Sequence, residues 1–224
     1  MRTAQIVVIL LIGVIAVLYA LDLAGDGQGV TDLAPAEVRE YQGEQLSSIT
    51  DFRENSIRGP QYVNASTYTL TVDGLVEDRE EYSYDALMER FPRYRKVVTL
   101  YCVEGWDVTI LWEGIRVEDL LLEAGVKPGA NTVIFYAADG YSSSLPLAYI
   151  EDRDILLAYA MNNVTLPAER GFPFQLVAED RWGYKWVKWV TRIEVSDDAN
   201  YRGYWESRGY SNNGSLDRSF FDRG

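Results

Sequence analysis

Cys102 is the residue whose type and setting most directly suggest chemistry, because it is the only cysteine in a 224-residue chain that contains no histidine. A single cysteine cannot form an internal disulfide. The lack of histidine excludes a Ser-His-Asp triad, a Cys-His dyad and any imidazole ligand for a metal or haem. If the chain carries out chemistry, the thiolate of Cys102 is its obvious soft metal ligand or nucleophile.

The sequence around Cys102 favours a functional side chain over a core side chain. A free cysteine usually packs as a small buried hydrophobe. Here 95–101 predicts a β-strand that runs into the cysteine, and 103–106 breaks the pattern with a carboxylate, a glycine and a tryptophan. A cysteine at the end of a strand, beside such residues, lies where the backbone delivers a ligand.

Two sequence blocks together resemble the molybdopterin-binding domain of the sulfite oxidase superfamily, which includes the catalytic subunit of bacterial protein-methionine-sulfoxide reductase. The first block is CVEGW at 102–106, followed by a W-x-G triplet and a short amphipathic helix. The second block spans 166–189 and matches the family's Leu-Pro, Gly-x-Pro and Gly-Tyr-Lys segments. The resemblance runs from about Ile49 to about Val195. It implies that Cys102 ligates the metal of a molybdopterin cofactor, in its molybdenum or tungsten form.

The resemblance also implies a cofactor-binding stretch in the second block. Gly183 permits the close backbone approach that phosphate cradles require, and Tyr184 follows it. Lys185 and Lys188 are the candidate cations for the pterin phosphate. Without the resemblance, both lysines would fit equally well on an exposed edge strand, where alternating lysines oppose aggregation.

Further cofactor-binding positions are carried over from the family's pattern. Thr50, Arg53 and Glu54 fall in its N-terminal binding loop, where an arginine could pair with phosphate through two hydrogen bonds. Arg170 and Gln175 depart from the pattern, since Asn or His is expected at the first position and Arg at the second. These changes would move one positive charge across the site, or would fit a different substrate anion, a different pterin form or a lost site.

Glu104 is the second catalytic candidate, because it lies two residues from the thiolate. It would orient a ligand, or donate a proton from a carboxyl group whose pKa is raised by burial. The alternative is a surface carboxylate in a turn.

The alternation of short apolar segments with turn signals predicts an α+β, sheet-dominated domain, which agrees with the fold of the resembled family. Helices are expected at 84–91 with Ser83 as N-cap, at 117–124 with Gly125 at its end, and at 38–46. The expected strands are 67–72, 95–101, 132–137, 155–161, 174–177 and 185–195.

Four segments are expected along the chain. Residues 1–24 are interpreted as one uncleaved transmembrane helix, since an apolar run of this length can span a bilayer, with a cleavable signal peptide as the alternative. Residues 25–48 form a polar linker. Residues 49–198 form the molybdopterin-binding oxidoreductase domain, and 199–224 form an aromatic, glycine-rich extension that packs on it.

Charge constrains location and partners. Arg2 precedes the apolar run and acidic residues follow it, which predicts a single-pass cell-membrane protein with its catalytic domain outside the cytoplasm. The sequence contains no twin-arginine pair, so it does not indicate by which route the domain would be exported. The net charge of −13 argues against nucleic acid as a partner, because phosphate binding needs a basic face.

The favoured hypothesis is a membrane-anchored molybdopterin-dependent oxidoreductase that transfers an oxygen atom to or from a small sulfur- or nitrogen-oxo compound, in the manner of a sulfoxide reductase or a sulfite oxidase. Electrons would pass to or from a separate membrane haem or quinone-linked protein, because the chain has neither a haem histidine nor a cysteine set for an iron–sulfur cluster. The alternative is a metal-free, anchored binding module that kept the fold. A cysteine-nucleophile hydrolase is a third possibility, weakened by the lack of a histidine base.

Overall fold

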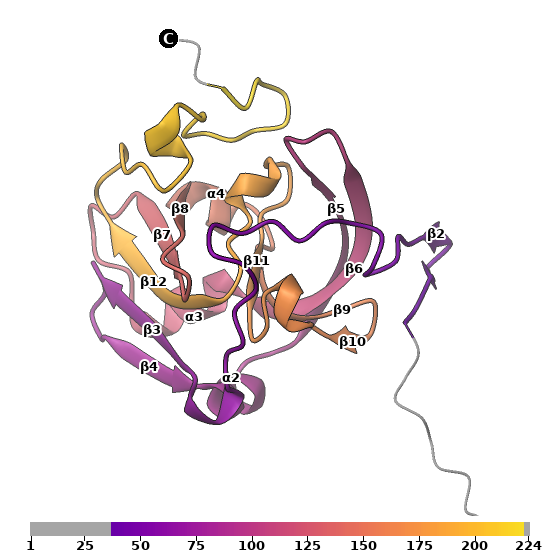
Figure 1. Cartoon of the computed structure of the whole chain (residues 1–224). Coiled ribbons are helices and arrows are strands. Elements are labelled where there is room, and N and C mark those ends of the chain that lie inside the picture. Colours follow the sequence, from indigo (N-terminus) through magenta and orange to yellow (C-terminus); the bar gives the residue numbers. More distant parts are fainter. Residues whose placement is uncertain (1–36, 222–224) are drawn as a thin grey trace, which may run out of the picture. The chain divides into compact units, whose positions relative to one another are not determined.

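Two five-stranded sheets dominate the fold of residues 37–221, the part of the chain that this computed structural model describes (Figure 1). The expected transmembrane helix at 1–24, and the first half of the expected linker, lie outside the described residues. Among residues 37–221 no helix is both long and apolar enough to span a membrane.

The first sheet carries Cys102 at one end. Its strands pair antiparallel in the order β10-β9-β6-β5, and β11 also pairs with β9. The strands are β5 (Tyr94–Tyr101), β6 (Asp107–Arg116), β9 (Leu156–Met161), β10 (Val164–Thr165) and β11 (Gln175–Val177). Because Tyr101 pairs with Asp107, the segment 102–106 is the tip of the β5–β6 hairpin.

The second sheet has the order β4-β3-β12-β7-β8. Only the β12–β3 pair is parallel, and it joins segments that are far apart in the sequence. The strands are β3 (Thr69–Gly74), β4 (Glu80–Ser83), β7 (Thr132–Ala137), β8 (Ser142–Pro146) and β12 (Val190–Ser196).

Within residues 37–221, three short α-helices connect the strands: α2 (Tyr84–Arg90), α3 (Val117–Ala124) and α4 (Leu147–Glu151). Ser83 caps α2, since its hydroxyl accepts a hydrogen bond from the Ala86 N–H at 3.2 Å. Helix α3 buries Val117, Leu120, Leu121 and Ala124, the positions that share one helical face. Gly125 ends α3 with φ +69°, a conformation that glycine adopts without strain.

One hydrophobic core joins the two sheets. Strand β9 is buried along its whole length, and Ile110, Trp112 and Ile115 of β6 pack into the same core as Phe135 of β7 and Ile193 of β12. A strand buried on both faces reads as a continuous apolar run, which is the pattern of 155–161.

Two expected elements are wrong. Residues 38–46 form no helix; they form a hairpin of β1 (Glu40–Tyr41) and β2 (Glu44–Gln45), because Gln42 and Gly43 both adopt positive φ at its turn. The strand expected over 185–195 begins only at Val190, since Gly183–Lys185 is a 3₁₀ turn. The helices near Ser83 and Gly125 and the strands near 95–101 and 132–137 are confirmed.

The segment with the β1–β2 hairpin and the C-terminal segment, residues 201–221, both contact the sheets. The Val38 N–H donates to the Asn162 carbonyl at 2.9 Å, and the Tyr204 N–H donates to the Ser142 carbonyl at 2.9 Å. Figure 1 shows the C-terminal segment in yellow, beyond the ends of β7 and β8. The expected boundaries of the linker, domain and extension stay predictions.

Candidate functional site

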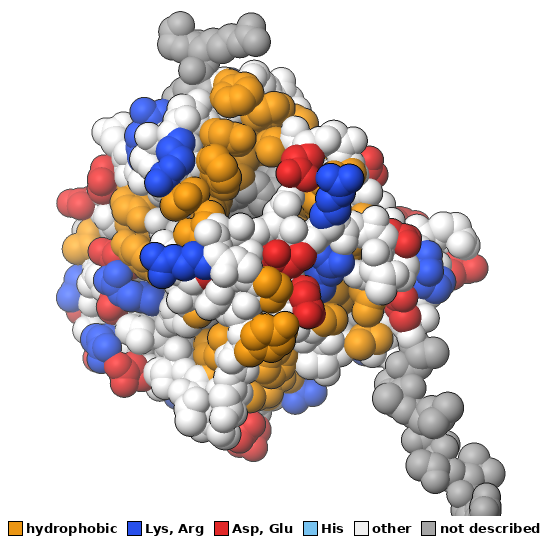
Figure 2. Space-filling model, viewed as in Figure 1, with side chains coloured by type: hydrophobic (Ala, Val, Ile, Leu, Met, Phe, Trp, Pro, Cys, Tyr) orange, Lys and Arg blue, Asp and Glu red, His pale blue; other side chains and the backbone are white. Residues whose placement is uncertain are grey.

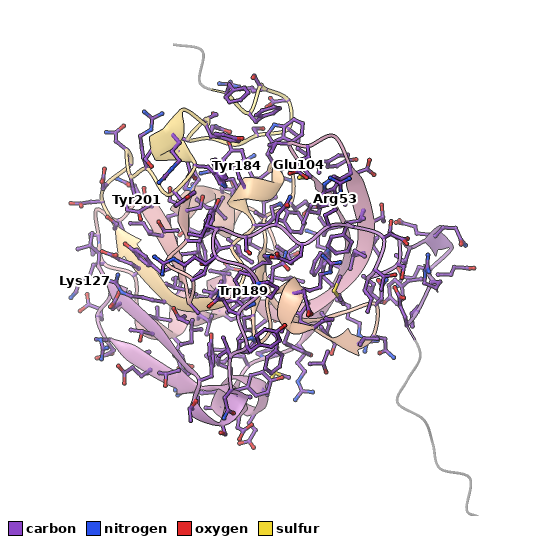
Figure 3. All side chains as sticks on the ribbon, in the orientation of Figure 1. Arg53, Glu104, Lys127, Tyr184, Trp189 and Tyr201 are labelled. Carbon is purple, nitrogen blue, oxygen red and sulfur yellow. The ribbon has the colours of Figure 1, made fainter. Side chains whose placement is uncertain are left out.

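A cavity of about 320 Å³ lies at the tip of the β5–β6 hairpin. Its walls come from the loop 52–57, the hairpin tip, the segment 169–189 and the C-terminal segment. Figure 3 labels four of the lining residues, Arg53, Glu104, Tyr184 and Trp189, which reach this cavity from three of those segments. Residues more than 100 positions apart in the sequence therefore share one site.

Cys102 faces this cavity and is 8% exposed. The turn that holds it closes through two backbone hydrogen bonds, from the Cys102 N–H to Trp106 O at 2.9 Å and from the Gly105 N–H to Cys102 O at 3.1 Å. Gly105 has φ +88°, which explains a glycine at this position. The sequence thus forms a tight hairpin tip that fixes the direction of one side chain.

Two donors point at the sulfur of Cys102. Asn55 Nδ2 lies 3.7 Å from Sγ and the Glu104 N–H lies 3.5 Å from it. Burial raises the pKa of the Cys102 thiol, and these hydrogen bonds oppose the rise without cancelling it. The thiol therefore stays protonated near neutral pH unless a metal or another cation stabilises the thiolate.

Glu104 lines the cavity but is exposed, so the expectation that burial raises its pKa is wrong. The Trp106 Nε1–H donates to Glu104 Oε2 at 3.1 Å. This hydrogen bond, another from Asn55 and the charge of Arg53 outweigh the small effect of burial and lower the pKa of the Glu104 carboxyl group. Glu104 is therefore ionised at neutral pH and suits orientation better than proton donation.

Lys188 lines the cavity and is already paired. Its Nζ lies 2.6 Å from Glu54 Oε1 and donates to the Glu169 carbonyl at 3.3 Å. Burial lowers the pKa of Lys188, and the Glu54 carboxylate opposes that change. Glu54 does not line the cavity itself; it holds the lysine that does. The alternative of an exposed edge strand is wrong for this lysine.

Arg170 lines the cavity, and its guanidinium group organises the loop that precedes Asn55. Its three nitrogens donate to the carbonyls of Ile49 at 3.1 Å, Phe52 at 2.6 Å and Arg53 at 3.2 Å. The guanidinium also stacks over the Phe52 ring at 3.7 Å. The arginine in place of the family's Asn or His therefore has a structural role in this chain.

Gln175 and Gly183 also reach the cavity. Gln175 is buried on β11. Gly183 packs against the end of β5, where an added Cβ would lie 3.2 Å from the Tyr101 carbonyl oxygen, so a side chain there would push the segment away from the hairpin. A parallel β-bridge between Tyr101 and Trp182 also holds this segment against the end of β5. It thereby brings Tyr184 beside the hairpin tip.

Two candidate residues besides Glu54 do not line the cavity. Thr50 is exposed, and its hydroxyl lies 3.0 Å from the Ser48 hydroxyl. Lys185 is fully buried; its Nζ lies 2.7 Å from Glu206 Oε1 and donates to the Ser144 carbonyl at 3.0 Å. Burial lowers the pKa of Lys185 despite the nearby Glu206 carboxylate. In this structure the Lys185 ammonium group therefore points into the protein core and not into the cavity.

Several lining residues were missed at the sequence level, among them Asn55, Ser56, Trp205 and Tyr210. Asn55 and Ser56 follow Glu54 directly, so the loop assignment alone pointed near them. Trp205 and Tyr210 come from the C-terminal segment, and no spacing in the sequence links them to Cys102. The Ser56 hydroxyl is buried and has no hydrogen-bond partner among the described residues.

The side chains present fit the cofactor that the resemblance implies. A single soft ligand faces the cavity, two donors point at its sulfur, and the unpartnered Ser56 hydroxyl offers a hydrogen bond to a polar guest. Arg53, Arg170 and Lys188 bring positive charge to the same space for an anionic group on the guest, beside the carboxylates of Glu104, Asp139 and Glu169.

Comparison with known proteins points to the same chemistry. The family described as "Oxidoreductase molybdopterin binding domain" matches residues 57–205. The chain is 36% identical to the uncharacterized oxidoreductase YuiH of Bacillus subtilis, over 67% of this chain and 76% of that protein. It is 33% identical to YedZ1 of Azospira oryzae, a putative protein-methionine-sulfoxide reductase subunit, over 66% of this chain and 56% of that protein.

A solved structure is also similar. The sulfane dehydrogenase SoxCD from Paracoccus pantotrophus superposes with a TM-score of 0.61 at 27% identity, over 69% of this chain and 43% of that chain. The chain thus spans about half the length of YedZ1 and of the SoxCD chain. The sheet-dominated α+β fold that the resemblance implied is confirmed.

Proposed function

We propose, because this chain belongs to the family of oxidoreductase molybdopterin-binding domains, that it transfers an oxygen atom to or from a small sulfur- or nitrogen-oxo compound. The cofactor of this family is molybdenum held by molybdopterin. When bound, it supplies the metal centre at which an oxygen atom and two electrons are exchanged with a substrate.

The observation that carries the proposal is the position of Cys102. Its sulfur faces the cavity at the rigid tip of a hairpin, with Asn55 Nδ2 and the Glu104 N–H within 3.7 Å and 3.5 Å. Donors of this kind stabilise negative charge on a sulfur ligand and fix its orientation. Cys102 would hold the metal, and Asn55 would orient the Cys102 sulfur.

The other cavity residues have roles that follow from their contacts. Arg53, Ser56 and Lys188 would bind the polar groups of the cofactor, and Gly183 and Tyr184 would let its ring approach the hairpin closely. Arg170 would keep the loop 49–53 in place, and Gln175 would donate or accept a hydrogen bond inside the cavity. Glu104, ionised and exposed at the mouth, would orient ligands and solvent near Cys102.

The charge and the walls of the cavity favour a neutral oxo substrate. The charged residues that line it are three cations, Arg53, Arg170 and Lys188, and three carboxylates, Glu104, Asp139 and Glu169. Two of the cations already have partners, and the cofactor requires positive charge as well. Little positive charge therefore remains to bind a dianionic substrate, whereas aromatic walls suit an organic sulfoxide.

The electron partner and the location complete the proposal. The sequence has one cysteine and no histidine, and thus no ligand set for a haem or an iron–sulfur cluster, so a separate membrane haem or quinone-linked protein would deliver electrons. The apolar run in 1–24 would anchor the protein as a single-pass membrane protein, with residues 49–198 outside the cytoplasm. The YedZ1 relative, named as a putative reductase subunit, supports an assembly with other subunits.

The test is turnover by the full chain purified from cells that make molybdopterin. Protein reduced by viologen should be reoxidised by dimethyl sulfoxide, and Cys102→Ser should lose this activity. Thr99→Ser, a change of one methyl group in the same hairpin, is the matched control and should keep it. A Cys102→Ser variant with full activity would contradict the proposal. A folded, metal-free and inactive wild type would favour a binding module instead.

A further inference from the structure

The C-terminal segment, Tyr201–Phe221, is built into the site and not merely attached near it. The Tyr184 hydroxyl donates to the Ser211 carbonyl at 2.7 Å, and the Trp182 N–H donates to the Gly214 carbonyl at 2.8 Å. In Figure 2 hydrophobic side chains gather on the upper part of the visible face, where Figure 1 places this segment. These bonds join the segment to the turn that carries Gly183 and Tyr184.

A buried ion pair joins the same two parts of the chain. Lys185 and Glu206 have fully buried side chains, and Lys185 Nζ lies 2.7 Å from Glu206 Oε1. The Ser143 hydroxyl donates to the same carboxylate oxygen at 2.5 Å, and Lys185 Nζ donates to the Ser144 carbonyl at 3.0 Å. Because both side chains are fully buried, removing one charge leaves the other buried without its counter-charge.

The ion pair lies next to two residues of the cavity wall. Trp205 directly precedes Glu206, and both Trp205 and Tyr210 line the cavity. The Trp205 and Tyr210 rings lie 5.1 Å apart, and the Tyr210 and Tyr184 rings also lie 5.1 Å apart. A force that holds Glu206 in place therefore also fixes the position of both aromatic rings.

We propose that the Lys185–Glu206 pair is a clasp that holds the C-terminal segment over the site, so that Trp205 and Tyr210 form the wall that limits the width of the substrate space. Lys185 and Glu206 are positioning residues, and Trp205 and Tyr210 determine which substrates fit. The clasp follows from the contacts alone, whereas the effect on substrates rests on the function proposed above.

The clasp is tested by tryptic cleavage of the full-length, cofactor-loaded protein after Arg208, which is exposed in the clasped segment. Glu206→Gln leaves the buried Lys185 ammonium group without its counter-charge, and Lys185→Met does the same to the Glu206 carboxylate. They should speed this cleavage by about tenfold or more, because the segment opens more often. The double variant Lys185→Met with Glu206→Leu removes both charges and should restore slow cleavage.

The matched control is Glu81→Gln, which breaks the exposed Arg79–Glu81 pair and should leave the cleavage rate unchanged. If the single variants are cleaved as slowly as wild type, the clasp does not exist. If the double variant is cleaved as fast as the single variants, the pairing of charges is not what holds the segment. Either result overturns the proposal, even if the single variants fold poorly.

The wall is tested with two neutral probes, dimethyl sulfoxide and diphenyl sulfoxide. Trp205→Ala should raise the ratio of kcat/KM for diphenyl over dimethyl sulfoxide by about tenfold or more, because removing the indole widens the space. Tyr201→Ala, in the same segment but not lining the cavity, should leave the ratio unchanged. An unchanged or lower ratio in Trp205→Ala overturns the assignment of the wall. If wild type reduces neither probe, the proposed function fails, while the cleavage rates still decide the clasp.

Discussion

The contacts of Cys102 suit the role of metal ligand that is proposed for it. Burial disfavours the thiolate and raises the pKa of this thiol, yet Asn55 and the Glu104 N–H lie where they would stabilise negative charge on the sulfur. The site is thus prepared for a bound cation, which would provide the remaining stabilisation. The side-chain donor, Asn55, is the partner that mutation can remove.

Replacing Asn55 with alanine should weaken metal retention. The change removes the hydrogen bond to Cys102 Sγ, and loss of a residue that orients a metal ligand typically costs about tenfold or more in affinity. Molybdenum per chain after prolonged dialysis should fall accordingly. Asn64→Ala, an exposed asparagine that caps a turn at Ser66, is the control and should retain metal as wild type does. Equal retention in both variants would contradict the role assigned to Asn55.

For single residues, the sequence indicated which side chain could do chemistry better than it indicated how the surrounding side chains are oriented. Cys102 was identified because it is unique and follows a strand. A carboxyl group with its pKa raised by burial was one of the roles considered for Glu104, but the structure exposes this side chain, as the alternative of a surface carboxylate in a turn expected. Lys185 and Lys188 were treated alike, whereas the 3₁₀ turn separates them: one pairs with Glu206 in the core and the other with Glu54 at the cavity. Such orientations depend on tertiary partners that local patterns do not contain.

Among the elements, the loop 49–55 most clearly connects folding to function. It carries Arg53 and Asn55 into the site, and it has no regular secondary structure of its own. Arg170 holds it through three carbonyls, and Glu37 accepts from the Ile49 N–H at 2.7 Å at the loop's start. Side chains from distant segments therefore replace the backbone ladder that a strand would have provided.

Arg170→Lys should loosen this loop. A lysine ammonium group cannot reproduce the planar fork that reaches three carbonyls, so at least one of them is left without its donor. We expect a loss of about 2 kcal/mol in the free energy of unfolding, measured in urea. Arg93→Lys changes an exposed arginine that donates only to the Met88 carbonyl, and it should change the free energy by much less. Equal losses in the two variants would show that the three-carbonyl contact is not special.

Glu37→Gln should destabilise the protein in a pH-dependent way. Burial alone would raise the pKa of Glu37, but hydrogen bonds from Asn162, Ile49 and Ser48 outweigh it and hold the pKa below 4.5. A lowered pKa stabilises the fold above the unfolded value, and this contribution disappears as pH falls through the folded value. Urea unfolding should therefore show a loss of about 1 kcal/mol at pH 7 that shrinks below about pH 4.5.

The control for this prediction is Glu44→Gln, which changes an exposed carboxylate on strand β2, in the hairpin that follows Glu37. It should have little effect at either pH. A Glu37→Gln loss that stays constant down to pH 3 would contradict the assignment, because it would not follow the ionisation of this carboxyl group.

Elements with strong apolar periodicity could be predicted from the sequence, and elements defined by turns could not. The α3 face at 117, 120, 121 and 124 and the buried run of β9 are examples of the first kind. The β1–β2 hairpin was missed because its strands have two residues each and depend on positive φ at Gln42 and Gly43. The start of β12 was misplaced because the Gly183–Lys185 turn is fixed by packing against β5.

For the whole molecule, function depends on contacts between distant segments. The hairpin tip, the loop 52–57 and the Gly183 turn meet at one cavity, and the C-terminal segment completes it. The parallel pairing of β3 with β12 joins residues about 120 positions apart, and no local pattern announces it. The resemblance to a known family implied that global arrangement, so the fold class was expected correctly, whereas no sequence pattern indicated the Lys185–Glu206 contact.

The most direct test of the central claim is the metal content of the full chain, purified from cells that make molybdopterin, beside its Cys102→Ser variant. We expect about one molybdenum or tungsten atom per wild-type chain and almost none in the variant, with both proteins folded. A well-folded wild type without metal, or a Cys102→Ser variant that keeps its full complement, would contradict the assignment of Cys102 as the metal ligand.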